Sequence, residues 1–189
     1  MERRSAAPRH RLAPIVAGAA IASGIVVLSL VARPLLARTQ AHDTVLERLQ
    51  RLEDREQILD LFTAYGATLD RGDFAAFEAL FAEDAEYGGG AGPLVHGRAA
   101  IRASLESIIA RNPANLPKPD FHLYFNPTIE VTGDRATARS LGAYVVPDAG
   151  TKGARLAIFV TYEDVLVRRD GRWLFLRRAI HGGIPATIR

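Results

Sequence analysis

Residues 121–180 decide the fold, and they read FHLYFNPTIE VTGDRATARS LGAYVVPDAG TKGARLAIFV TYEDVLVRRD GRWLFLRRAI. Apolar and β-branched residues alternate here with polar ones at a period of two, which is typical of β-strands. Gly133-Asp134 and Asp170-Gly171 interrupt the alternation with turn-forming residues. We therefore predict antiparallel strands over 121–131, 136–146, 156–168 and 173–180.

The chain before these strands has a helical period instead. Apolar side chains recur at steps of three and four from Val45, and again through Leu59, Phe62, Tyr65 and Leu69. We predict helices over 44–71, 74–81 and 97–111, with Asp73 capping the second. Three helices followed by strands indicate an α+β fold, a curved antiparallel sheet wrapped around the helices and enclosing a pocket. The stretch 45–59 also suits a short coiled-coil stalk between two copies.

The charge of the chain is divided between a leader and a body. Residues 1–41 carry six arginines and one acid, whereas residues 42–189 carry 18 basic and 20 acidic residues. Residues 12–32 contain no charge, are long enough to cross a bilayer as a helix, and follow four arginines. We predict a leader, 1–41, with a transmembrane segment near 12–32, and a body, 42–189, outside the cytoplasm. The body is either membrane-anchored or exported after cleavage of the leader.

Composition excludes several classes of site. The chain has no cysteine, which rules out disulfides and thiolate metal sites. No run of basic residues with interleaved aromatics occurs in the body, so we expect no nucleic-acid partner. No two histidines have metal-ligand spacing, and the glycines of 88–92 lack the Lys-Ser/Thr of a phosphate loop. We expect neither a metal nor a cofactor.

Several short motifs resemble the SnoaL-like family of the nuclear-transport-factor-2-like superfamily, whose members are cone-shaped α+β domains. The segments Leu69–Phe74 and Phe77–Ala85 resemble the junction after the first helix, and His96–Ile101 resembles the start of the third. The last hairpin is matched by Tyr162-Glu163-Asp164, Arg168, Asp170-Gly171, Trp173 and Arg178. The resemblance implies a domain that binds a small hydrophobic, oxygenated molecule.

The resemblance also implies a catalytic pair. In members of the scytalone dehydratase and bile-acid 7α-dehydratase types, an Asp ending the first helix pairs with a His on the first long strand, and Asp70 and His122 match these positions. Substrate-binding roles are implied for Tyr65, Tyr144, Tyr162 and Arg178, and alternation alone leaves open whether Arg177 or Arg178 faces the pocket. Leu69 stands where the scytalone type has Tyr, and residues 140–146 lack that type's second His.

Two functions remain open at this point. One is a cofactor-independent lyase (dehydratase) or isomerase in which His122 transfers a proton and Asp70 orients it. The other is a non-catalytic domain at the cell envelope that binds an apolar ligand or forms a homodimer through its open sheet face.

Overall fold

The computed structural model describes residues 21–89 and 93–183, with side chains described from Thr44 onward. Contacts divide the chain into two units, Met1–Glu47 and Arg48–Arg189, close to the boundary expected at 41/42. The predicted transmembrane segment 12–32 begins outside the described residues. Within the described part of the chain, no helix combines the length and apolarity that a membrane span requires.

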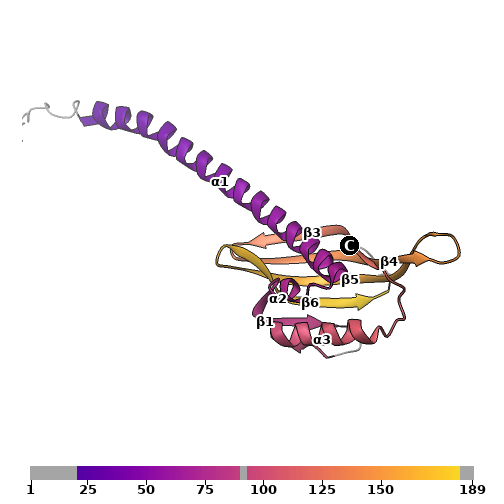
Figure 1. The fold of residues 1–189 in the computed structure, drawn as a ribbon. Helices are drawn as coiled ribbons and strands as arrows, with labels where there is room; N and C mark the ends of the chain where they lie inside the picture. The colour runs from indigo at the N-terminus through magenta and orange to yellow at the C-terminus, as the bar shows by residue number, and fades with distance from the viewer. Residues whose placement is uncertain (1–20, 90–92, 184–189) are drawn as a thin grey trace, which may run out of the picture. The chain divides into compact units, whose positions relative to one another are not determined.

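The second and third helices lie near their predicted positions, whereas the first begins well before residue 44 (Figure 1). This helix, α1, runs from Ile21 to Arg71 without a break at Pro34. A proline removes one backbone hydrogen bond and kinks a helix without always ending it. The others are α2 (Phe74–Glu78) and α3 (Arg98–Arg111). Asp73 caps α2 as predicted, because its Oδ1 accepts from the Ala76 amide at 3.0 Å.

The sheet contains six strands in the order β2-β1-β6-β5-β4-β3. Their bounds are β1 Phe81–Gly88, β2 Val95–His96, β3 Phe121–Thr132, β4 Arg135–Asp148, β5 Gly153–Arg169 and β6 Arg172–Gly182. The last four pair antiparallel as predicted. Asp170 and Gly171 both have positive φ (51° and 74°), as a two-residue hairpin turn requires.

The expectation of a purely antiparallel sheet is wrong, because β1 pairs in parallel with β6. The sequence predicts that the second helix reaches Phe81, whereas α2 ends at Glu78 and β1 begins at Phe81. The pairing of β1 shifts register between Phe81 and Glu86, which interrupts the alternation of its side chains. The period of two that reveals the other strands is therefore missing from β1. The fold is α+β with a mixed sheet.

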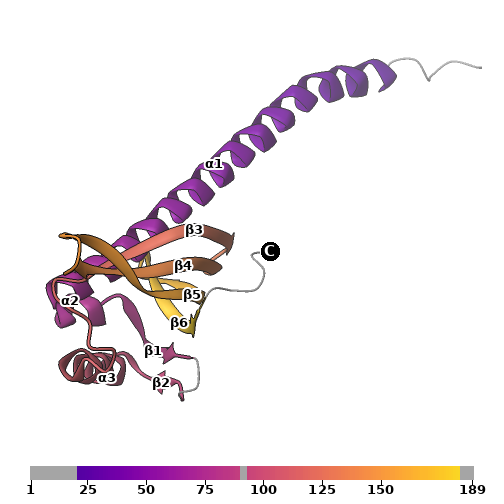
Figure 2. The same ribbon diagram turned by 90° about the vertical axis from the view of Figure 1, so that its right-hand side faces the viewer.

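Within Arg48–Arg189, the core lies between the helices and one face of the sheet, here called the inner face. Phe62 and Tyr65 of α1 contact Phe175 of β6 with ring centroids 5.9 and 5.7 Å apart. Figure 2 shows α3 beside β1, at the end of the sheet away from β3. The opposite, outer face of strands β3–β6 is not covered by any helix of this unit. The inner face is therefore where a buried site can form.

Candidate active site

Asp70 and His122 meet at the end of α1. Asp70 lies in the last turn of α1, and alternation along β3 turns His122 to the inner face. Asp70 Oδ1 lies 2.6 Å from His122 Nδ1. The backbone amide of His122 also donates to Asp70, at 3.1 Å to Oδ1 and 3.3 Å to Oδ2. The carboxylate therefore holds both the ring and the backbone of the histidine.

The second ring nitrogen of His122 is available for chemistry. Because a carboxylate only accepts hydrogen bonds, Nδ1 carries the proton and Nε2 keeps its lone pair. Nε2 is buried and has no hydrogen-bond partner among the described residues. Burial lowers the pKa of His122 below its ordinary value of 6.5, although Asp70 and then Asp120 act to raise it. At neutral pH the ring is uncharged and can accept a proton.

A cavity of about 220 Å³ is lined in part by His122. Its walls are mainly apolar, with Leu69 from α1, Leu105 and Ile109 from α3, and Ile158 and Val160 from β5. The amide of Asn112, also in the wall, is satisfied by the Leu116 backbone, donating at 3.0 Å and accepting at 2.9 Å. The cavity thus suits an apolar molecule that presents a polar group to His122.

Tyr144 also lines the cavity. It lies opposite His122 in the pairing of β3 with β4, and the two rings are 4.1 Å apart at 58°. Burial raises the pKa of Tyr144, so its hydroxyl remains protonated and can donate to a ligand oxygen. Of the four residues predicted to bind substrate, Tyr144 lines the cavity.

Tyr65, Tyr162 and Arg178 lie in the core and do not line this cavity. The Tyr65 and Tyr87 hydroxyls are hydrogen-bonded at 2.8 Å. The guanidinium carbon of Arg178 lies 4.1 Å from the ring centroids of both Tyr65 and Tyr162. A Cβ added at Gly142 would come within 2.3 Å of the Tyr162 ring, so glycine is what lets this ring pack against β4. Substrate binding by these three residues stays a prediction from the family resemblance.

The structure resolves which arginine faces inward. Arg178 is fully buried, and its Nε lies 3.1 Å from Oδ1 of Asp164, its neighbour across β5 and β6. The side chain of Arg177 is half exposed on the outer face, 3.7 Å from Glu86. Of the two arginines, Arg178 therefore faces inward, into the core, and it does not line the cavity beside His122.

Sequence reasoning assigned no role to Asp164. Burial raises its pKa to about 6, against the opposing attraction of Arg178. Carboxyl groups with strongly shifted pKa values are common at functional sites and also occur in structural ion pairs. The motif Tyr162-Glu163-Asp164 contained this residue, but the sequence does not tell which of its two acids is buried.

Lys118 and Asp120 form the charged part of the cavity lining. Lys118 Nζ lies 2.5 Å from Asp120 Oδ1, and both side chains contribute to the wall. They lie in the proline-rich loop after α3, where the sequence offered no periodic signal. Among the described residues, no group of three or more His, Asp or Glu side chains is arranged to hold a metal ion.

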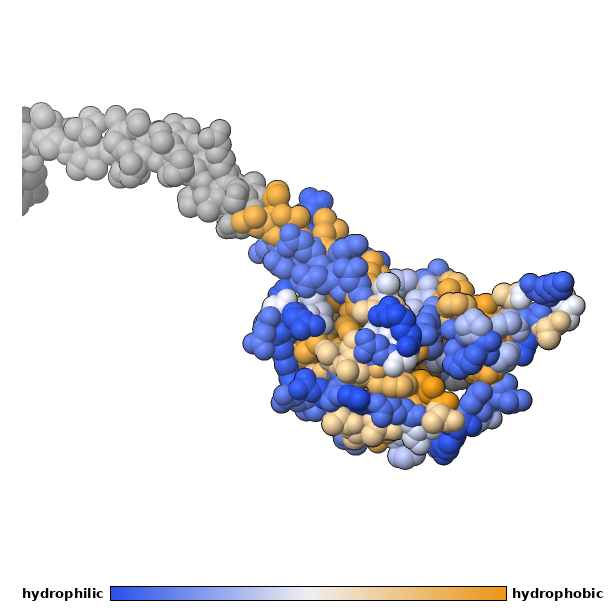
Figure 3. Space-filling model, in the orientation of Figure 1, coloured by the Kyte–Doolittle hydropathy of each residue, from blue (hydrophilic) through white to orange (hydrophobic). Residues whose placement is uncertain are grey.

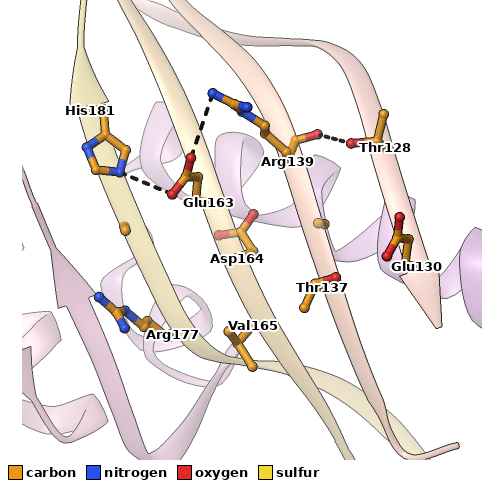
Figure 4. A pocket seen from close by; sticks show the side chains of 11 residues that line it. Thr128, Glu130, Thr137, Arg139, Glu163, Asp164, Val165, Arg177 and His181 are labelled. Carbon is orange, nitrogen blue, oxygen red and sulfur yellow. Dashed lines mark hydrogen bonds and ion pairs between the residues drawn. The ribbon is translucent and has the colours of Figure 1, made fainter. Parts of the chain in front are cut away.

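A larger hollow of about 490 Å³ lies on the outer face of the sheet (Figure 4). It is open, and its charged side chains pair with one another: Glu163 lies 3.7 Å from Arg139 and 3.6 Å from His181. Such half-exposed pairs contribute little, and buried Asp164, which also lines the hollow, is already paired with Arg178. The buried cavity beside His122 is the better candidate for chemistry.

Comparisons with known proteins agree with this fold. The model of a SnoaL-like domain matches residues 50–179. An NTF2-like protein with a cystatin-like fold from Novosphingobium aromaticivorans is 30% identical, covers 72% of this chain and 86% of its own, and superposes with a TM-score of 0.62. A protein of unknown function from Mycobacterium tuberculosis is 25% identical, with 72% and 76% coverage and the same TM-score, 0.62.

A proposed scytalone dehydratase from Novosphingobium aromaticivorans is similar in fold, at 24% identity, 71% and 87% coverage and a TM-score of 0.59. A comparison with curated protein sequences found no match.

Proposed function

Because the chain belongs to the SnoaL-like family, which has ligand-binding and some enzymatic members, we propose that it binds a small hydrophobic, oxygenated molecule beside His122 and acts on it as a cofactor-independent lyase or isomerase. The observation that carries the proposal is the contact of 2.6 Å between Asp70 Oδ1 and His122 Nδ1. This contact leaves Nε2 without a hydrogen-bond partner among the described residues, in a side chain that lines an apolar cavity. A base held in this way is suited to proton transfer.

In the proposed reaction, His122 Nε2 takes a proton from a carbon of the ligand. Asp70 holds the Nδ1 proton and stabilises the imidazolium that forms. The Tyr144 hydroxyl donates to the ligand oxygen on which charge develops. The proton then returns to the leaving hydroxyl in a dehydration, or to another carbon in an isomerisation, so that no external reductant or oxidant is needed.

The size of the cavity limits the substrate. A volume of about 220 Å³ is below that of most ligand sites, which typically enclose ~300–1,000 Å³. We therefore expect a compound with one or two rings that carries a hydroxyl next to an acidic C–H bond.

Turnover of hydroxylated one- and two-ring compounds by the purified chain tests the proposal. His122→Ala should lower turnover by about 10²–10⁴-fold, the usual contribution of a general base. Ligand binding by the His122→Ala variant, measured by calorimetry, should be largely retained. His181→Ala is the matched control, because His181 lies on the outer face. Equal turnover in the His122→Ala variant would remove the proposed base.

The alternative is a domain that binds its ligand without converting it. Leu69 and the missing second His favour this alternative, because the dehydratase-type set of residues is incomplete. A ligand that raises the melting temperature of the wild-type chain but yields no product would support it over the enzyme.

A specific surface favours the homodimer that the second function includes. Phe121, Leu123 and Phe125 are 51%, 43% and 38% exposed along the outer face of β3. Neighbouring apolar side chains of this size are unusual on an uncovered surface. Leu123→Asp should convert such a dimer to a monomer in sedimentation velocity, without changing ligand binding in the cavity.

A further inference from the structure

The surface of α1 after Arg48 carries separate apolar, basic and acidic stripes. Leu49 and Leu52 are 50% and 65% exposed, on the side of the helix away from buried Ile58 and Leu61. Figure 3 shows hydrophobic side chains at the surface where the described side chains of α1 begin. The basic stripe is Arg48, Arg51 and Arg55, and the acidic stripe is Glu53, Glu56 and Asp60. Arg48 and Arg55 lie on one side of the leucines and Glu53 and Asp60 on the other, whereas Glu56 is in line with Leu49.

The basic stripe borders a groove of about 310 Å³ between α1 and β3. Its lining is Arg48, Arg51, Leu52, Arg55, Ile129 and Val131. Within the described part of the chain, no ion pair or hydrogen bond involves the side chains of these three arginines. A groove with unneutralised cations and an apolar floor fits a partner that carries acids beside apolar side chains.

The acidic stripe of α1 itself has that chemistry. Leu49 and Leu52 occupy the a and d positions of a heptad, and the same spacing reaches back to Val45 in the sequence. Arg48 and Arg55 are then g positions, and Glu53 and Asp60 are e positions. In a parallel pair of helices, each g residue meets the e residue five positions later on the other helix.

The charges therefore favour a parallel over an antiparallel arrangement of the two helices. In the parallel arrangement Arg48 meets Glu53 of the second copy, and Arg55 meets Asp60 of the second copy. An antiparallel pair brings g positions together and opposes arginine to arginine. Glu56, at the next a position, ends the apolar seam, so the contact is short and should depend on concentration.

We propose that two copies of this chain associate in parallel through this face of α1, with the acidic stripe of each copy against the basic groove of the other. The contact uses neither the cavity beside His122 nor the outer face of the sheet. It therefore holds or fails independently of the proposed function.

Because the chain contains no cysteine, a single introduced cysteine can form a disulfide only with the same cysteine of a second copy. Disulfide cross-linking therefore tests the contact. Leu52→Cys in the purified full-length chain should form a disulfide-linked dimer under mild oxidation, seen on a non-reducing gel. Gln57→Cys is the matched control, exposed on the same helix but away from the seam. Leu123→Cys reports separately on pairing through the outer face of the sheet.

Charge exchange tests the orientation. Arg48→Glu and Glu53→Arg should each reduce the cross-linked fraction of Leu52→Cys, by about fivefold for two symmetric pairs. The double variant should restore it. Cross-linking of Leu52→Cys no greater than that of Gln57→Cys would overturn the proposal. Loss in the single variants without recovery in the double variant would overturn the parallel arrangement.

Discussion

At the scale of the residue, the state of His122 depends on three charged neighbours. Burial lowers its pKa, Asp70 and Asp120 raise it, and Lys118 lowers it. Asp70 lies on α1, and Lys118 and Asp120 lie in the loop before β3, so each can be changed separately. The Asp70 contact decides which nitrogen holds the proton, and the other charges adjust how readily the second nitrogen accepts one.

Proton NMR of the His122 ring should report a pKa below 6.5 in the wild-type chain. Asp70→Asn should lower it further, because a raising influence is removed, whereas Lys118→Ala should increase it. A lowered pKa also means that the unfolded chain binds the proton more readily. The free energy of unfolding, compared with that of His122→Asn, should therefore fall as pH decreases through about 6.5. A His122 pKa above 6.5 would contradict this account of its burial.

At the scale of the element, Asp54 joins α1 to the β5–β6 hairpin. It is 2% exposed. Its Oδ1 accepts from Trp173 Nε1 at 3.0 Å and from Arg168 Nη1 at 2.5 Å. Burial makes the loss of such a shared acceptor costly, because both donors would remain without a partner. This contact stabilises the packing of α1 against the sheet, which also places Asp70.

Asp54→Ala should lower the free energy of unfolding by about 2–3 kcal/mol, measured by urea denaturation. Asp134→Ala is the matched control, because Asp134 pairs with the same Arg168 at 2.8 Å but its side chain is 74% exposed. An exposed pair contributes little, so we expect a change of about 0.5 kcal/mol or less. Similar losses in both variants would show that burial of Asp54 does not matter.

At the scale of the whole molecule, the charge division predicts where the chain resides. We propose that residues 12–32 hold the body at a membrane, outside the cytoplasm, or that the body is exported after the leader is cut. The full-length chain should then sediment with membranes and resist high salt, which removes proteins bound by charge alone. A variant starting at His42 should remain in the supernatant.

The N-terminus of the mature protein distinguishes the two routes. Mass spectrometry should find Met1 at the N-terminus of an anchored chain and His42 at that of a cleaved one. In the leader, Thr39-Gln40-Ala41 is the stretch that best resembles a signal-peptide cleavage site. Full-length chain recovered from the cytoplasmic supernatant would contradict both routes.

The sequence predicts the elements whose side chains have a regular period. The strands β3–β6 alternate and are closed by turn residues, and α3 presents Ile101 and Leu105 at helical spacing, so both could be found. The strand β1 could not, because its register shift removes the alternation and its parallel partner β6 lies more than 90 residues away. Pairing over such a distance leaves no local signal.

The candidate site, like the fold, could be predicted from the sequence only in part. Asp70 and His122 are recognised from a family pattern, but their contact over 52 positions of sequence exists only in the folded chain. Tyr144 reaches the cavity because it pairs with His122 across β3 and β4. Tyr65 and Tyr162 have the same chemistry, but they pack around Arg178 in the core instead.

The sequence by itself determined the α+β class, the family and the separation of a basic leader from a mildly acidic body, because period and charge are local properties. The stretch 121–180 specified four antiparallel strands for this reason. Only the tertiary structure decided that the sheet is mixed, that Arg178 is buried against Asp164, and that His122 lines the cavity. These depend on which distant segments pack together, and burial among them sets the ionisation of each group.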